Sequence, residues 1–66
     1  MNQRIIDFIS KHAKGEVFTK SEYMNHFEGI SKITAQSDIK QMVELHLCEV
    51  RGNGPSTRYL LVKTYQ

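Results

Sequence analysis

The sequence has no long apolar run, only one cysteine and little net charge, and the first two of these features exclude classes of protein. The longest apolar run, YLLV at residues 59–62, is far below the about 20 residues that a membrane-spanning helix needs. The first residues, MNQRIIDFIS, carry charges inside their apolar stretch, which excludes a signal peptide. Cys48 is the only cysteine, so no disulfide forms within the chain, and we expect it to be a small buried hydrophobe in a cytoplasmic protein.

The net charge of +2 does not by itself indicate a nucleic-acid partner. Its distribution is more informative, because residues 51–66 contain Arg51, Arg58 and Lys63 and no acidic residue. A basic segment of this kind fits a nucleic-acid contact and fits an ordinary solvated surface equally well. The length of 66 residues predicts a single domain, residues 1–66, with a small core and a free energy of unfolding below the usual range of about 5–15 kcal/mol.

Apolar residues at spacings of three and four predict a first helix over residues 2–14, capped by Asn2 and ended by Gly15. We expect basic residues in its last turn, where the helix dipole favours positive charge. The apolar stripe consists of Ile5, Ile6, Phe8 and Ile9. The segment EVF, residues 16–18, is too short for a helix and is expected to be extended.

Two further helices are predicted on either side of Gly29. Thr19 and Glu22 have the spacing of a capping box, so a short helix is expected between Thr19 and Gly29. Ser31 then caps a longer helix that ends near His46. Its core-facing residues are Ala35, Ile39, Met42 and Val43.

A β-hairpin is predicted for the C-terminal segment, because the loop GNGPS separates two β-rich runs at residues 47–51 and 57–63. Strand alternation places Tyr59 and Leu61 on one face and Arg58 and Leu60 on the other. The extended segment at residues 16–18 can join the hairpin as a third strand. The expected fold class is therefore α+β, a winged helix with a three-helix core and a small antiparallel sheet.

About half of the chain, GISKITAQSDIKQMVELHLCEVRGNGPSTRYLL, resembles the winged helix-turn-helix at the C-terminus of Fic-family proteins and, more loosely, that of DeoR-type repressors. The first motif is matched by Ile30, Ser31, Thr34, Ala35, Asp38 and Ile39. The second is matched by Gly52, Gly54, Ser56, Thr57, Arg58 and Tyr59. Where DNA-binding relatives often carry two arginines, this chain has Gln36 and Ser37, and His46 replaces the usual glycine at the helix end. The His-Pro-Phe motif of Fic enzymes is absent, so the resemblance implies no transferase activity.

The leading functional hypothesis is that the third helix and the hairpin bind double-stranded DNA, as a transcriptional regulator or a DNA-targeting module. A helix about 10–12 Å in diameter fits a major groove about 12 Å wide. Gln36 could pair with adenine, Thr34 or Ser37 could contact a phosphate or a base, and the lysines would hold phosphates. The candidate nucleic-acid-binding residues are Lys32, Thr34, Gln36, Ser37, Lys40, Arg51, Asn53 and Arg58.

The alternative is a protein-interaction module, such as an adaptor, a small inhibitor or the regulatory domain of a larger Fic-type protein. Neutral Gln36 and Ser37, an exposed Ile33 and the low net charge favour it. A homodimer is a further possibility, through whatever part of the first helix the core leaves exposed, although we expect that apolar stripe to pack in the core.

An enzyme is not expected, because no catalytic or metal-binding constellation is visible. The histidines and Cys48 lack metal-ligand spacing, so we predict no cofactor, no metal and no small-molecule ligand. Asp38 has no carboxylate partner at catalytic spacing and is expected to pair with a neighbouring base such as Arg58 or Lys40.

Overall fold

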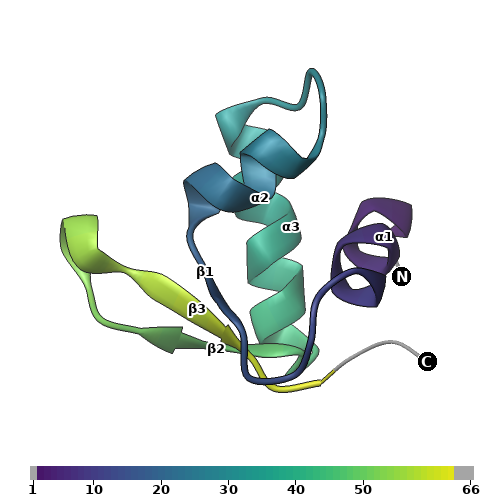
Figure 1. The fold of residues 1–66 in the computed structure, drawn as a ribbon. Coiled ribbons are helices and arrows are strands. Elements are labelled where there is room, and N and C mark those ends of the chain that lie inside the picture. The colour runs from purple at the N-terminus through teal and green to yellow at the C-terminus, as the bar shows by residue number, and fades with distance from the viewer. Residues whose placement is uncertain (1, 64–66) are drawn as a thin grey trace.

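The computed structural model describes residues 2–63 and has an α+β fold, in which three helices pack against a small antiparallel sheet (Figure 1). The elements follow one another in the predicted order. They are α1 (Gln3–Ser10), β1 (Val17–Phe18), α2 (Lys20–His26), α3 (Lys32–Glu44), β2 (Cys48–Arg51), a 3-10 turn (Gly54–Ser56) and β3 (Arg58–Leu61). Within residues 2–63, none of the helices combines the length and the apolar composition that crossing a bilayer requires.

The first helix begins where predicted but ends earlier. The Asn2 side chain accepts a hydrogen bond from the Arg4 backbone N–H, as expected of an N-cap. The helix stops at Ser10 rather than at residue 14, and its last turn contains no basic residue, so both of these predictions were wrong. The reason is tertiary: the Gly15 N–H donates to the Leu61 carbonyl at 2.7 Å, so the chain must leave the helix early to reach β3.

The predicted N-caps of the second and third helices are confirmed. Thr19 and Glu22 form the predicted capping box, and the Ser31 side chain accepts the Thr34 N–H at 3.1 Å. The turn between the helices contains Gly29 at a φ of 77°. The third helix ends at Glu44, and His46 follows in the left-handed region at a φ of 60°, which few non-glycine residues adopt.

The sheet has the strand order β1-β3-β2, so the predicted third strand joins the hairpin at the far side of β3. Phe18 and Val50 both lie opposite Tyr59, while Val17 and Glu49 both lie opposite Leu60. Because side chains alternate along a strand, the Tyr59 row and the Leu60 row occupy opposite faces. Leu61 is buried and Tyr59 packs against the core, as the predicted alternation requires.

The core forms where α1, α2, α3 and the inner face of the sheet meet. Phe8 is its aromatic centre, with ring centroids 4.9 Å from Phe18 and 4.8 Å from Tyr23. Three residues of the α1 stripe, Ile5, Phe8 and Ile9, are at most 1% exposed. These three side chains are therefore not available for self-association, and the expectation of core packing is confirmed for them, whereas Ile6 is partly exposed.

Candidate nucleic-acid interface

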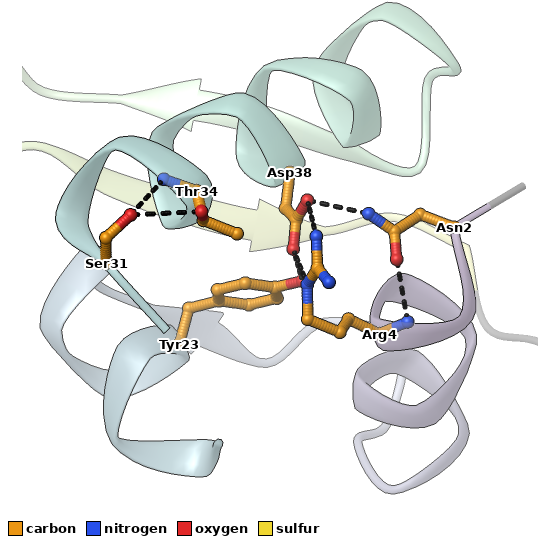
Figure 2. Close-up of polar contacts among 6 residues, drawn as sticks. All are labelled: Asn2, Arg4, Tyr23, Ser31, Thr34 and Asp38. Atoms are coloured by element: carbon orange, nitrogen blue, oxygen red, sulfur yellow. Dashed lines mark hydrogen bonds and ion pairs between the residues drawn. The ribbon is translucent and has the colours of Figure 1, made fainter. Parts of the chain in front are cut away.

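One side of α3 carries a buried carboxylate that joins all three helices (Figure 2). Asp38 is 1% exposed, and its Oδ2 accepts hydrogen bonds from the Tyr23 hydroxyl at 2.8 Å and from Arg4 Nε at 2.7 Å. Its Oδ1 accepts from Asn2 Nδ2 at 2.7 Å and from Arg4 Nη2 at 3.1 Å. Among the residues that the structure describes, no buried side-chain polar atom lacks a partner. The buried charge is therefore compensated within the fold.

The prediction that Asp38 pairs with Arg58 or Lys40 was wrong. Lys40 is two positions further along the helix, and residues two apart on a helix point in different directions. Arg58 lies on β3 opposite Arg51, in the sheet row that faces away from the core. The actual partner, Arg4, comes from α1, because the packing of α1 against α3 brings the first turn of α1 beside the middle of α3.

This network changes the protonation of its members. Burial raises the pKa of Tyr23, and the hydrogen bond to Asp38 and its negative charge raise it further. The hydrogen bond to Asp38 also raises the pKa of Arg4. Tyr23 therefore stays a neutral donor and Arg4 stays a cation, which holds α3 in one orientation relative to α1 and α2.

The opposite side of α3 is exposed, and four of the eight candidate residues lie on it. Ile33, a large apolar side chain, is 77% exposed among the polar residues of this face. The exposed candidates on this outer face of α3 are Lys32, Gln36, Ser37 and Lys40. Thr34 differs from them, because it is half-buried and its hydroxyl accepts a hydrogen bond from the Ser31 hydroxyl at 3.0 Å (Figure 2).

The hairpin carries the other candidates at its far end, which extends away from α1 (Figure 1). Arg51 and Arg58 are exposed and lie directly opposite each other across β2 and β3, an arrangement that repulsion between like charges disfavours. Glu49 offsets this repulsion, since its Oε1 is 2.6 Å from Arg51 Nη2. Asn53 is exposed in the loop.

The tip of the hairpin is compact because of one glycine. Gly52 has a φ of 77°, and a Cβ at this position would lie 2.8 Å from the Ser56 carbonyl oxygen. The loop is closed by the Thr57 hydroxyl, which donates to the Gly54 carbonyl at 2.8 Å. The hairpin therefore presents Asn53 on a tight turn rather than on a loose loop.

A groove of about 330 Å³ separates α3 from the inner face of the hairpin. Its apolar lining consists of Ile39, Val43, Val50 and Tyr59. Gln36 and Lys40 contribute to it from α3, and Lys20 contributes from the start of α2. The structure thus brings Gln36 and Lys40 together at this groove, whereas Arg51 and Arg58 lie on the other face of the sheet. Sequence reasoning missed Lys20 and Val50, although the alternation that placed Tyr59 inward also applies to Val50.

The remaining chemically active side chains form no metal centre in the described part of the chain. Cys48 is 2% exposed, and burial raises the pKa of its thiol to about 11, so it is not a nucleophile at neutral pH. His12 and His26 both pack on Phe8, with their ring centroids 5.6 Å apart. Within residues 2–63, no group of three or more His, Cys, Asp or Glu side chains could hold a metal ion.

Comparison of the chain with family models, with curated proteins and with solved structures finds no match. The resemblance to the winged helix-turn-helix of Fic-family proteins therefore stays a prediction from the residues that carry it. Function is inferred from the charges, the exposure and the arrangement of the side chains.

Proposed function

We propose that the chain is a winged-helix domain that binds double-stranded DNA through α3 and the β2–β3 hairpin. One observation carries the proposal: Lys32 and Lys40 lie on an exposed polar face of α3 and belong to no ion pair within residues 2–63. The two ion pairs in this part of the chain use Arg4 and Arg51 instead. Unpaired cations on an exposed helix are suited to DNA phosphates.

The dimensions of α3 support this proposal. Its 13 residues span about 20 Å, and a helix about 10–12 Å in diameter enters a major groove about 12 Å wide. Asp38 anchors the inner side of the helix to α1 and α2, so the outer side is presented in a fixed orientation. A rigid element positions side chains against base edges better than a loop does.

The proposed roles follow from exposure. Lys32 and Lys40 hold phosphates, while Gln36 and Ser37 reach base edges, where a glutamine can make two hydrogen bonds to adenine. Ile33 lies beside them and contacts a thymine methyl group. Thr34 has a smaller role than the sequence predicts, because its hydroxyl is engaged with Ser31.

On the hairpin, Arg58 and Asn53 contact the neighbouring backbone. Arg51 must first exchange Glu49 for a phosphate. That exchange is feasible, since an exposed ion pair of this kind contributes only about 0–1 kcal/mol.

A titration with a short random-sequence duplex at low and at moderate salt tests the proposal. Four phosphate contacts, from Lys32, Lys40, Arg51 and Arg58, predict a slope of log K against log salt of about −3.6. The variants Lys40→Ala and Arg58→Ala should each weaken binding and reduce the slope by about one unit. Lys11→Ala, an exposed lysine at the end of α1, is the matched control and should leave both unchanged. Equal affinity of all four proteins would exclude this interface.

A protein-interaction module is the second candidate function, and the exposure of Ile33 favours it. An apolar side chain that is 77% exposed can serve as a contact for a protein partner or for a second copy of the chain. The NMR spectrum separates the two candidates. Changes on adding random duplex DNA at low salt support DNA binding, and an unchanged spectrum supports the protein-interaction module.

A further inference from the structure

The groove between α3 and the hairpin has the composition of a binding site. Its volume of about 330 Å³ lies at the lower end of the range of about 300–1,000 Å³ for ligand sites and accommodates a few side chains. Val50 is 49% exposed on the groove side of the sheet, and Val43 and Tyr59 are half-buried. Covering apolar surface in a concave site favours binding, because it removes that surface from water.

The polar residues that line the groove are cationic or neutral. Lys20 and Lys40 contribute from α2 and α3, and neither makes an ion pair with a carboxylate in residues 2–63. The nearest acidic residue in sequence to Lys20, Glu22, is held in the capping box by the Thr19 N–H. Glu44 is one helical turn beyond Lys40 and makes no ion pair with it. The groove therefore complements a ligand that combines apolar groups with negative charge.

We propose that this groove binds a short peptide segment of a partner protein that carries apolar side chains next to carboxylates. The apolar side chains cover Val43, Val50 and Tyr59, and the carboxylates pair with Lys20 and Lys40. A DNA backbone fits the groove less well, because its phosphates could pair with Lys20 and Lys40 but it has no apolar side chains to cover Val43, Val50 and Tyr59. The occupant is therefore a peptide rather than a nucleic acid.

If the chain also binds DNA as proposed, peptide binding has a consequence for that function. Only this consequence rests on the proposed DNA binding. Lys40 and Gln36 belong both to the groove and to the proposed DNA-contacting face of α3. A bound acidic segment would occupy Lys40 and place negative charge where DNA phosphates would lie. Peptide and DNA would then exclude each other, which would make the peptide-bearing partner an inhibitor of DNA binding.

The test is an NMR titration of the ¹⁵N-labelled chain with the capped peptide acetyl-EDLLDE-amide in the absence of DNA. Two control peptides replace the leucines by serine or the acidic residues by their amides. We expect saturable shifts at Val43, Val50 and Tyr59 with the first peptide and none with either control. Shifts spread evenly over the surface, or the same shifts with the amide peptide, would overturn the proposal.

The chain offers a closely matched pair of variants. Val50 is 49% exposed on the groove face, and Val17 is 50% exposed in the row on the opposite face of the same sheet. Val50→Ser should weaken peptide binding by up to about tenfold, because it removes one apolar contact without adding a charge, whereas Val17→Ser should leave it unchanged. Lys40→Ala should weaken binding by up to about fivefold, the effect of one exposed ion pair.

Equal effects of the two valine variants on peptide binding would overturn the proposal. Shifts at the groove that depend on protein concentration in the absence of peptide would also overturn it, because they would identify a second copy of the chain as the occupant. A final competition step adds random duplex DNA to the peptide complex. Because the peptide titration contains no DNA, its outcome stands whether or not the chain binds DNA.

Discussion

The two sides of α3 differ in how their polar groups are satisfied. On the inner side, the Asp38 carboxylate accepts hydrogen bonds from three side chains of α1, α2 and the residue before α1. On the outer side, Lys32 and Lys40 have no charged partner within residues 2–63. The same helix therefore uses one face to hold the fold together, while the lysines of the other face make no ion pair within residues 2–63.

This difference separates structural residues from candidate functional ones more reliably than residue type does. Asp38 is charged and lies on the same helix as the exposed lysines, yet its burial and partners give it a structural role. Ile33 is apolar and would ordinarily be assigned to a core, yet it is exposed. Truncating a side chain on the inner side should change stability, whereas truncating one on the outer side should change binding with little effect on stability.

The largest expected effect is on the inner side. Asp38→Ala leaves the Tyr23 hydroxyl and the Asn2 amide without an acceptor, so we expect the free energy of unfolding to fall by about 3 kcal/mol. Urea denaturation followed by circular dichroism measures it. The control is Asp7→Ala, an exposed carboxylate on α1 that accepts one bond from Gln3, and its effect should stay within about 0.5 kcal/mol. Similar losses in both variants would contradict a special role of the inner side.

The next effect is on the outer side and concerns DNA sequence. If Ile33 contacts a thymine methyl group, a duplex of adenine and thymine should bind about fourfold more tightly than its uracil counterpart, the value of one buried methyl group. Ile33→Ala should remove this difference without changing stability, because the side chain is 77% exposed. Fluorescence anisotropy with the paired duplexes provides the measurement. Equal affinity of the wild type for the two duplexes would show that Ile33 does not contact the methyl group.

A smaller effect is expected where the outer face of α3 ends. His46 has a φ of 60°, so His46→Gly should raise the free energy of unfolding by about 0.5–1 kcal/mol by relieving the left-handed backbone. Gln36→Gly, an exposed position inside the helix, should have the opposite sign and lower it by about 0.5–1 kcal/mol. Thermal unfolding of both variants provides the measurement. A change in melting temperature of the same sign in both would contradict the backbone strain assigned to His46.

The smallest effect concerns pH. Burial lowers the pKa of His26, and the positive charges of His12 and Lys11 lower it further, while Asp7 acts in the opposite direction. An unfolded histidine takes up a proton near pH 6.5. The unfolded chain therefore binds more protons just below that pH, so the free energy of unfolding should fall as the pH drops from about 7 through the folded pKa.

Denaturation curves across this pH range test the expectation. His26→Gln should flatten the pH dependence, and Lys11→Ala should flatten it in part, because one of the repelling charges is removed. A pH dependence that both variants leave intact would assign it to other groups.

Signals that act between neighbours in the chain were predictable. Asn2, Thr19 and Ser31 cap their helices as expected, because a cap depends on a side chain and a backbone N–H two or three residues away. The face of each strand was also predictable for Tyr59 and Leu61, since alternation is a property of the extended backbone. The exposure of Lys32, Gln36, Ser37 and Lys40 followed from the helical period.

The sequence by itself determined the order of the elements, the starting residues of the helices and the inner and outer sides of α3, because these depend on interactions over a few residues. Only the tertiary structure decided that α1 ends at Ser10, that Arg4 is the partner of Asp38 and that Lys20 meets Lys40 across a groove. Each of these depends on which distant segments the core brings together. That choice is made by the packing of apolar faces rather than by the polar residues that the packing then places side by side.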